Sequence, residues 1–463
     1  MYFHFLPTSF ISHLKRIFCF HNFQKMFQRI IVVCGIIAFF SCSSVTSQCL
    51  TGDADNPTTM DVDFKQKLTQ ARLDFALDTL RRVSQFEGVD NVFYSPHSLH
   101  EALTLAYFAA RGTTEESLKR ALHVPETYSK TYVQRFYDFE NMLRRISRMS
   151  GNSSADYEFS SVNKLWVTQE RKIRECMLDL FGTQLEHVDF KKDPEAIRQM
   201  INNWASNETK GHINDLLPIG GVTEDSDLVL ANAVYFKGLW KSKFDPKRTT
   251  CDKFVIDLVH FLFFSSAVVS EELKTHILQL PYKGEDLSMY ILLPPFAGAR
   301  TSDSERTPEG LTQLIERITN TEAGIAELKQ FLEEGLPPRE VSVSLPKFKI
   351  DKELAVGHLL NAMGAGDIMT SNADLRGLLA DGEPSLHLGD AVHRAVVDVT
   401  EEGTTAAAAT ALFSFRSSRP AEPEVFNANH PFVYFIYDRP ARSILFAGIY
   451  RTPPNANANP SYS

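Results

Sequence analysis

Two kinds of hydrophobic pattern divide the chain into an early and a late half. In the early half, apolar residues recur every three or four positions, the period of an amphipathic helix, and residues 64–83 show this most clearly. Ser95-Pro96 is a capping serine followed by a proline suited to the first helical position, so a second helix should run from there to Gly112. Further helices are predicted at 113–122, 136–149 and 194–206.

In the late half, short and nearly continuous apolar runs predict strands. Residues 228–240 (LVLANAVYFKGLW) are apolar almost throughout, so both faces of that strand should be covered. The other predicted strands lie at 91–94, 162–167, 287–293, 341–345, 347–350, 391–399, 430–437 and 443–450. Early helices and late strands favour an α+β fold with large mixed sheets.

One loop between two predicted strands fits neither pattern. It follows Glu402 and Gly403, runs through small residues, and ends near Phe426. A stretch of ~20 residues without secondary structure inside a compact domain is usually functional. We therefore expect this loop to be the working part of the molecule.

Composition and charge narrow the classes of function. The chain has 463 residues, 43% hydrophobic and 23% charged, which is ordinary globular composition. Between residues 62 and 453 there is no Pro/Ser/Gly-rich linker, which favours one large domain. The net charge of −9 argues against nucleic-acid binding, which needs a basic face.

Motifs of catalysis and of metal binding are missing from the sequence. It contains no GxSxG, HExxH, P-loop or dinucleotide-binding motif in context, and its six cysteines have no metal-ligand spacing. His393 lies inside a predicted strand, where a buried structural histidine is more common than a general base. We therefore expect no catalytic residues, no metal and no cofactor, and the protein should not be an enzyme.

The N-terminus has the features of a secretory signal. Lys25 and Arg29 form a basic start around the first residue of the segment 26–47, and the apolar run at 30–40 that follows is too short for a span of ~20 residues. Residues 1–25 would be an upstream extension, and an uncleaved anchor is the alternative. Removal of the signal leaves Cys49, Cys176 and Cys251, which allow one disulfide at most, and the sequence does not choose the pair. We expect a secreted, extracellular protein with no membrane association after signal removal.

A secreted protein can be glycosylated at Asn-X-Ser/Thr. Asn152-Ser153-Ser154 and Asn207-Glu208-Thr209 fit this pattern, so the protein is predicted to be a glycoprotein.

Several motifs in residues 62–453 together resemble the serpin family of serine protease inhibitors, which also has non-inhibitory members. They are NVFYSPHS (91–98), INNW (201–204), LANAVYFKGLW (230–240), LPYKG (280–284), LPKFKI (345–350), ADL (373–375), EEGTTAAAAT (401–410) and FNANHPF (426–432). The loop and the last motif are most similar to arthropod secreted inhibitory serpins. Residues 62–453 would form the serpin domain, and residues 399–427 its hinge and reactive loop.

The resemblance implies a fold of three β-sheets and eight or nine helices with an exposed C-terminal reactive loop. A target protease cuts this loop and forms an acyl-enzyme. The loop then inserts as a new strand into the largest sheet and carries the protease with it, which distorts the protease active site. The expected partner is a trypsin-like serine protease, the expected form is a monomer, and the resemblance suggests a role in immunity and melanisation.

The first residues of the loop suit insertion into a packed sheet. Alternate residues of a strand share one face, and every second residue from Thr404 is small; these hinge residues are Glu402, Gly403, Thr404, Ala406, Ala408 and Thr410. No proline occurs before Pro420. The pattern favours an inhibitory serpin over the alternative, a non-inhibitory carrier or storage serpin.

Three positions compete as the residue before the cleaved bond. The usual spacing of the family from Gly403 ends at Ser417, and a loop shorter by one residue ends at Arg416. Arginine suits the acidic primary pocket of trypsin-like proteases. Arg419 precedes Pro420, and a bond to proline is a poor substrate. We predict cleavage at Arg416–Ser417.

The resemblance also assigns residues that control the conformation of the sheet. Ser95, Ser98, Asn232 and His393 would form a polar cluster beneath the opening of the sheet, and Trp240 would lie where the loop enters. Arg144, Arg145 and Arg148 form a basic helical segment, for which a solvated face is the more common explanation. The alternative is that these arginines bind a sulfated polysaccharide.

One segment departs from the family pattern. Residues 255–270 (VIDLVHFLFFSSAVVS) replace a longer stretch that normally contains a Met-Met strand motif. Intron read-through or a mispredicted exon would explain the departure. If the segment is real, we expect an unpaired sheet edge and a defective variant.

Overall fold

The computed structural model describes residues 49–50, 62–149, 157–244, 246, 249–250, 258–295, 309–402 and 424–453. The predicted upstream extension and signal (1–25 and 26–47) and Asn152 lie outside these residues. So does most of the predicted reactive loop: Gly403, Thr404, Ala406, Ala408, Thr410, Arg416, Ser417 and Arg419.

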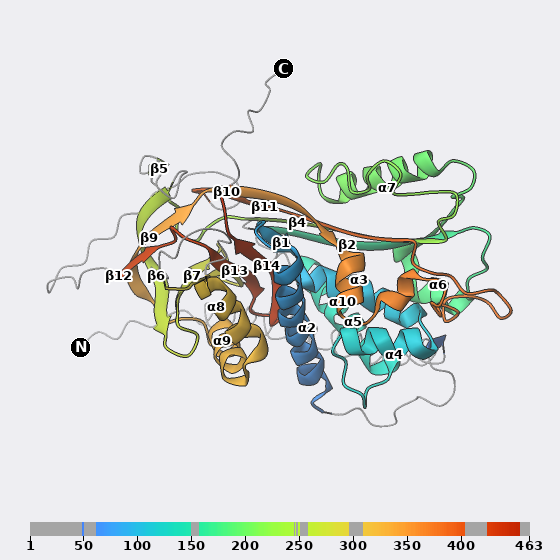
Figure 1. The fold of residues 1–463 in the computed structure, drawn as a ribbon, viewed down its shortest axis with the longest axis horizontal. Coiled ribbons are helices and arrows are strands. Elements are labelled where there is room, and N and C mark those ends of the chain that lie inside the picture. The colour runs from blue at the N-terminus through green and yellow to red at the C-terminus, as the bar shows by residue number, and fades with distance from the viewer. Residues whose placement is uncertain are drawn as a thin grey trace, which may run out of the picture.

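A five-stranded sheet runs along the long axis of the molecule (Figure 1). Its strand order is β10 (Phe348–Ala355), β11 (Asp390–Val399), β4 (Leu228–Gly238), β2 (Tyr157–Thr168) and β3 (Leu185–Val188). β11 and β4 are parallel to each other, and each is antiparallel to its other neighbour. The predicted strand at 228–240 is thus the middle strand, and its residues are buried almost throughout, as its sequence requires.

The other described strands form a connected set of nine, with eight strands in one path and β5 beside it. Its order is β1 (Val92–Tyr94), β14 (Ser443–Tyr450), β13 (Phe432–Asp438), β8 (Leu287–Leu293), β7 (Thr275–Pro281), β6 (Leu258–Ser270), β9 (Arg339–Pro346) and β12 (Glu424–Asn427), with β5 (Thr249–Thr250) beside β6. This path consists of two sheets that share β6, because the first part of β6 pairs with β9 and its last part pairs with β7. Together with the five-stranded sheet they make the three sheets expected.

Helices cover the sheets, and nine α-helices lie within the described residues. α7 (Pro194–Glu208) lies on one face of the five-stranded sheet (Figure 1). The opposite side carries α2 (Phe64–Phe86), α3 (Pro96–Ala109), α4 (Gly112–Ala121), α5 (Lys130–Met149), α6 (Glu175–Phe181) and α10 (Val356–Ala362), while α8 (Glu309–Asn320) and α9 (Glu322–Glu334) lie beside the β13/β8 region. The α+β prediction is confirmed.

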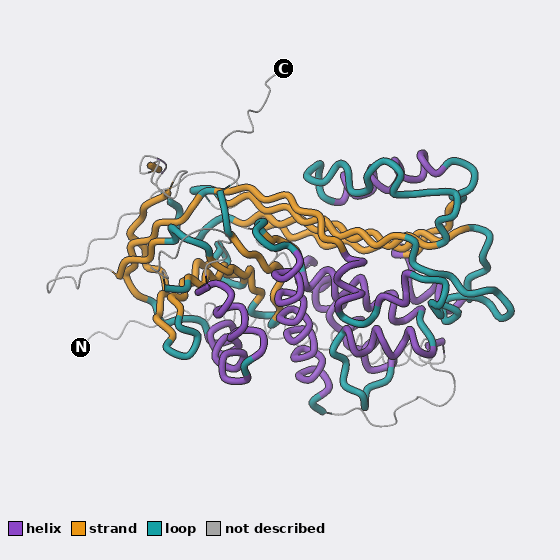
Figure 2. The backbone as a smooth tube through the Cα atoms, viewed as in Figure 1, coloured by secondary structure: helices purple, strands orange, loops and turns teal. Residues whose placement is uncertain are grey.

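The hydrophobic core between the two sheet layers is rich in aromatic rings. Phe446 stacks on Phe93 at 5.1 Å between ring centroids and also meets Phe236 of β4 at 5.8 Å. Gly448 is required here, because a Cβ at this residue would lie 2.2 Å from the Tyr434 ring. The tube in Figure 2 shows the long strands of the five-stranded sheet passing over these inner strands.

The atypical segment 255–270 forms one strand over its described residues. β6 is fully paired with β9 along Leu258–Ser265. On its other edge in this region, β5 supplies only two pairs, Thr249 with Val259 and Thr250 with Leu258. The segment therefore has a place in the sheets, but the described residues cover its outer edge only in part.

A disulfide joins the N-terminal end of the described chain to α6. Cys49 and Cys176 are bonded, with 5.9 Å between their Cα atoms. This is one of the pairings that the sequence left open. Among the described residues, no helix is both long enough and apolar enough to cross a membrane.

Candidate functional site

The middle of the five-stranded sheet contains a seam between β4 and β11. Their parallel pairing runs from Val229–Asp390 to Tyr235–Val396. The predicted loop follows shortly after β11 in the sequence. If it turned back, it would run antiparallel to both β11 and β4 and could form hydrogen bonds with each of them. The seam is therefore a geometrically suitable place for an additional strand.

A row of polar side chains crosses the sheet at the seam. His393 of β11 pairs in register with Asn232 of β4, which pairs with Asn163 of β2. His393 Nδ1 is hydrogen-bonded to Asn232 Oδ1, and Asn232 Nδ2 contacts Asn163 Oδ1. Side chains at the same register position of adjacent strands share a face, so the row links three strands at one level.

The first turn of α3 completes this polar cluster. The backbone N–H of Ser95 donates to His393 Nε2 at 3.0 Å, and Asn232 Nδ2 donates to Ser98 Oγ at 2.5 Å. Ser98 Oγ also lies 2.7 Å from Ser161 Oγ of β2. The helix is thereby attached to both sides of the seam.

His393 is neutral in this arrangement. Its Nε2 accepts a hydrogen bond, so Nδ1 carries the proton that it donates to Asn232. The side chain is fully buried, and burial lowers the pKa of His393 to about 3. The histidine holds the strands together and is not placed to act as a base on a substrate.

Ser95 has two tasks at the start of α3. Its Oγ accepts from Ser98 N at 3.1 Å, which caps the helix as predicted, and donates to Leu445 O of β14 at 2.5 Å. The cap fixes the helix end that faces His393.

The end of the seam nearest the loop is closed by the chain that follows β4. Trp240 Nε1 donates to Thr400 O at 3.0 Å, and its backbone N–H donates to Glu402 O at 3.2 Å. Its indole ring is buried and stacks on Tyr282 with 4.5 Å between centroids. Phe244 N donates to Glu401 O at 2.7 Å. The last residues before the loop are thus held in place.

Two acidic side chains lie at this end of the seam. The Glu401 carboxylate is bonded to Thr249 Oγ1 at 3.0 Å and to Lys347 Nζ at 3.1 Å. Burial raises the pKa of Glu401, but hydrogen bonds from its own backbone N–H, from Lys347 and from Thr249 outweigh this effect and leave the pKa below its usual value. Glu402 Oε2 is buried without a hydrogen-bond partner among the described residues.

The structure brings together Ser95, Ser98, Asn232 and His393, and it places Trp240 at the end of the seam. Sequence reasoning missed Ser161, Asn163 and Lys347. Asn163 could have been found, because a polar residue at an inward position of a predicted strand needs a buried partner. Lys347 lies far from Glu401 in sequence, and no local signal identifies it.

The remaining predicted sites lie away from the seam. Asn207 is exposed in the last turn of α7. Arg144, Arg145 and Arg148 are in the C-terminal part of α5, but their side chains are outside the described residues, so polysaccharide binding stays a prediction.

A serine, a histidine and a glutamate lie in a row that could suggest catalysis. Ser443 Oγ is 2.9 Å from His97 Nδ1, and His97 Nε2 is 3.4 Å from Glu101 Oε1. Ser443 is only 2% exposed, so a substrate cannot reach its hydroxyl. No group of metal-binding side chains occurs in the described part of the chain.

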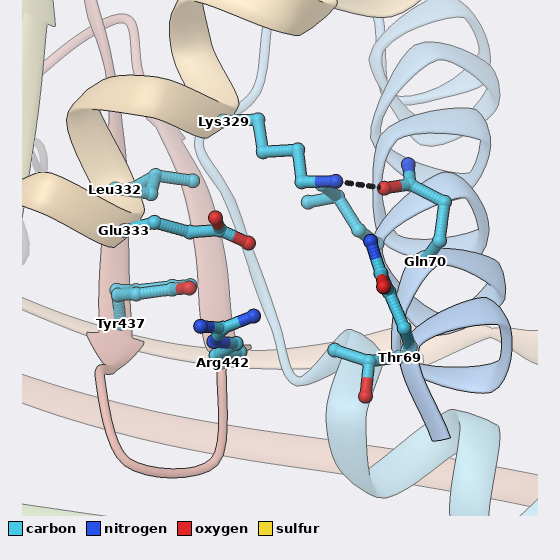
Figure 3. Close-up of a pocket in the computed structure, with 9 residues that line it drawn as sticks. Thr69, Gln70, Lys329, Leu332, Glu333, Tyr437 and Arg442 are labelled. Carbon is cyan, nitrogen blue, oxygen red and sulfur yellow. Dashed lines mark hydrogen bonds between the residues drawn. The ribbon is translucent and has the colours of Figure 1, made fainter. Parts of the chain in front are cut away.

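A cavity near α2 is too small to hold a ligand. It lies between α2, α9 and the β13–β14 turn, with Lys329 bonded to Gln70 at 2.5 Å (Figure 3). Its volume of about 20 Å³ holds one water molecule at most.

Comparison with known proteins finds a family model and relatives that match most of the chain. A family model described as "Serpin (serine protease inhibitor)" matches residues 70–453. The chain is 34% identical over 416 residues to serine protease inhibitor 88Ea of Drosophila melanogaster, which covers 85% of this chain and 92% of that protein. It is 33% identical over 407 residues to human leukocyte elastase inhibitor, covering 84% of this chain and all (100%) of that protein.

Solved structures have the same fold. Serpin48 of Tenebrio molitor superposes with a TM-score of 0.66 at 27% identity, covering 84% of this chain and 99% of that chain. Uncleaved ovalbumin superposes with a TM-score of 0.69 at 24% identity, covering 84% and 100%.

Proposed function

Because this chain belongs to the serpin family, whose members are protease inhibitors and not enzymes, we propose that it traps trypsin-like serine proteases outside the cell. The reactive loop is the bait and Arg416–Ser417 is the bond cut. The inhibitor acts as a monomer and requires no cofactor.

The observation that carries this proposal is the closed seam between β4 and β11. The loop begins directly beyond the end of β11, and the contacts that close the seam are non-covalent. An inserted strand would replace one parallel ladder by two antiparallel ladders. Each additional hydrogen bond would contribute about 0.5–1.5 kcal/mol, so insertion releases energy that is stored in the uncleaved form.

The covalent step uses the chemistry of the protease. Its catalytic serine attacks the carbonyl carbon of Arg416 and its histidine takes the serine proton. The bond to Ser417 breaks, and the nitrogen of Ser417 leaves as an amine with that proton. An ester then joins Arg416 to the protease. Loop insertion draws this ester away before water can hydrolyse it.

Two structural features support secretion. The Cys49–Cys176 disulfide is typical of proteins that fold in an oxidising compartment. Asn207 is exposed, so its side chain is accessible for glycosylation. A function in immunity and melanisation rests on the resemblance to arthropod serpins.

Incubation with trypsin followed by a denaturing gel tests the proposal. We expect a band at the summed mass of both proteins, and mass spectrometry should find a released C-terminal peptide beginning at Ser417. A clipped chain without the larger band would favour the carrier alternative. A peptide beginning at Ser418 or Pro420 would move the bond to Ser417 or Arg419.

A pair of hinge variants separates insertion from cleavage. Thr404→Arg places a charge at an inward position, where its desolvation costs several kcal/mol, roughly, and should turn the inhibitor into a substrate. Thr405→Arg introduces the same charge at the neighbouring outward position and should retain the covalent band. Equal behaviour of the two variants would contradict insertion.

A further inference from the structure

A groove of about 520 Å³ runs along one face of α7. Its lining residues recur every three or four positions, from Ala196 through Met200 and Trp204 to Glu208, so they lie on one face of the helix. At 1.5 Å per residue, this face is ~18 Å long. α7 lies on its own side of the five-stranded sheet (Figure 1). The groove is therefore a long, shallow site on an exposed helix.

The lining of this α7 groove suits a neutral ligand. Glu208 carries the only formal charge among the described lining residues. Met200 and Trp204 are partly buried and supply apolar surface. Asn203 is exposed, and its amide makes no hydrogen bond with another described residue. An amide can donate to and accept from hydroxyl groups, and the C–H groups of a sugar ring pack on apolar surface. This combination favours a neutral carbohydrate over a sulfated one.

The Trp204 ring is held in place before any ligand binds. It lies edge-on to the Trp166 ring, with 5.0 Å between the centroids and 79° between the planes. Trp166 belongs to β2 and is only 1% exposed, so it is a rigid support. A ligand that packs on a fixed ring loses little of its affinity to side-chain ordering.

One carbohydrate attachment point lies inside the groove. Asn207 is exposed, lines the groove, and begins the glycosylation pattern Asn207-Glu208-Thr209. Side chains on a helix tilt toward its N-terminus. A sugar on Asn207 is thereby directed back along α7, over Asn203 and Trp204. Covalent attachment also gives such a sugar a high effective concentration at the groove.

We propose that the α7 groove binds the protein's own N-glycan, attached to Asn207. The sugar nearest the protein packs on Trp204, the following sugars lie over Met200 toward Ala196, and the Asn203 amide bonds to their hydroxyl groups. The glycan then covers this face of α7 and closes it to other proteins. This inference rests on the glycosylation that supports the proposed function, and it is independent of protease inhibition.

Quenching of tryptophan fluorescence by acrylamide measures the docking. The chain has three tryptophans, and Trp166 and Trp240 are 1% and 2% exposed, so the quenching reports mainly Trp204. Removal of the N-glycans from the folded protein, secreted by cultured mammalian cells, uncovers the Trp204 ring and should raise the quenching constant about twofold. An unchanged constant would overturn the proposal.

Two matched variants assign the effect to one glycan. Asn207→Gln should show the raised quenching of the deglycosylated protein. Asn152→Gln removes the other predicted attachment point by the same substitution and should be quenched like wild type. Equal quenching of the two variants would contradict the α7 groove. Thermal unfolding of each variant checks that the fold is intact.

The rate at which peptide-N-glycosidase releases the Asn207 glycan tests the role of Trp204. The rate for folded protein is divided by the rate for the same protein after denaturation, so that only shielding by the fold is compared. Trp204→Leu keeps an apolar side chain but removes the stacking surface, and it should raise this ratio about twofold to tenfold, the range of aromatic contacts. An unchanged ratio would show that the glycan does not pack on Trp204.

Peptide mass spectrometry and trypsin challenge separate this inference from protease trapping. We expect a glycan on the peptide that contains Asn207, and its absence would overturn the inference. Asn207→Gln should still form the covalent complex with trypsin, because its reactive loop is unchanged. If wild type and this variant both fail to form the complex while the quenching differs between them, the proposed inhibition fails and the groove is supported.

Discussion

At the scale of single residues, the protonation of the His393 ring determines whether the polar cluster that joins the strands can form. The ring accepts from Ser95 and donates to Asn232, so it is complementary only in its neutral form. Protonation would replace an acceptor by a donor facing the Ser95 N–H. The cluster is therefore stable only while His393 lacks a second proton.

The first prediction concerns the pH dependence of stability. The pKa of His393 is about 3 in the folded chain and ordinarily 6.5. The unfolded chain thus binds more protons between these values, and stability from this residue is present above pH 6.5 and lost as pH falls toward 3. The slope is at most about 1.4 kcal/mol per pH unit.

Urea unfolding of wild type and His393→Gln at pH 7, 6 and 5 measures this contribution. The variant should be less stable at pH 7 and should lose less stability on acidification. Burial also lowers the pKa of His100 to about 3, so part of the slope should remain in both proteins. Parallel curves would show that His393 does not contribute.

A second prediction at this scale concerns Trp240. Phenylalanine would keep the ring stacked near Tyr282 but lose the hydrogen bond to Thr400 O. Trp240→Phe should weaken the closed end of the seam by about 0.5–1.5 kcal/mol. The variant should convert more quickly on warming into a form that resists protease and forms no complex. An unchanged conversion rate would mean that Thr400 is held by other contacts.

At the scale of elements, we expect β4 and β11 to separate at the seam during loop insertion, whereas β2 and β4 should stay paired. Val234→Cys/Ala395→Cys places thiols on a register pair across β4 and β11, and both sites are buried. Val162→Cys/Ala233→Cys does the same across β2 and β4. Adjacent paired residues have a Cα separation compatible with a disulfide.

The third prediction is that only the first of these locks abolishes trapping. With the β4–β11 lock, trypsin should clip the chain without a covalent complex, and reduction should restore the complex. The β2–β4 lock should leave trapping intact, because these strands remain neighbours after insertion. Wild type under the same reductant controls for loss of the Cys49–Cys176 bond.

The sequence predicts the long, strongly patterned elements well and the long-range pairings poorly. The helix at 64–83 and the strand at 228–240 correspond to α2 and β4, because each has a clear period or a continuous apolar run. Sequence reasoning missed β7 and the short α10, whose few residues carry too little pattern, and it also missed α8 and α9, although these helices have 12 and 13 residues. The position of Asn163 beside Asn232 depends on strand register, which no local pattern contains.

The family resemblance supplied most of what periodicity could not supply for the site. It placed Ser95 and His393 in one cluster although they lie 298 residues apart in the sequence. It could not anticipate how residues 258–270 are accommodated. The structure shows that a single strand can belong to two sheets, because its two ends find different partners.

At the scale of the whole molecule, the disulfide Cys49–Cys176 closes a very long loop. A sequence separation of 127 residues corresponds to a loss of unfolded-state entropy worth about 5 kcal/mol in the chain-entropy account. The bond restrains the N-terminal end of the described chain against α6.

The fourth prediction is that Cys49→Ser/Cys176→Ser lowers stability by several kcal/mol, up to about 5. Urea unfolding of the secreted protein should show the loss. Cys251→Ser changes a cysteine outside this bond and should leave stability within about 0.5 kcal/mol. A loss in the control as large as in the double variant would point to another pairing.

The pairing of β1 with β14 has a consequence for biosynthesis. Val92 lies opposite Ile449 in the register of the sheet, so β1 can pair only when almost the whole polypeptide has been translated. β4 and β11 are both available once Val399 has been made. Translation proceeds at about 5–20 residues per second, so β4 and β11 are complete before β13 and β14 have been made. A premature stop codon after residue 430 would therefore deprive β1 of its only described neighbour in the sheet.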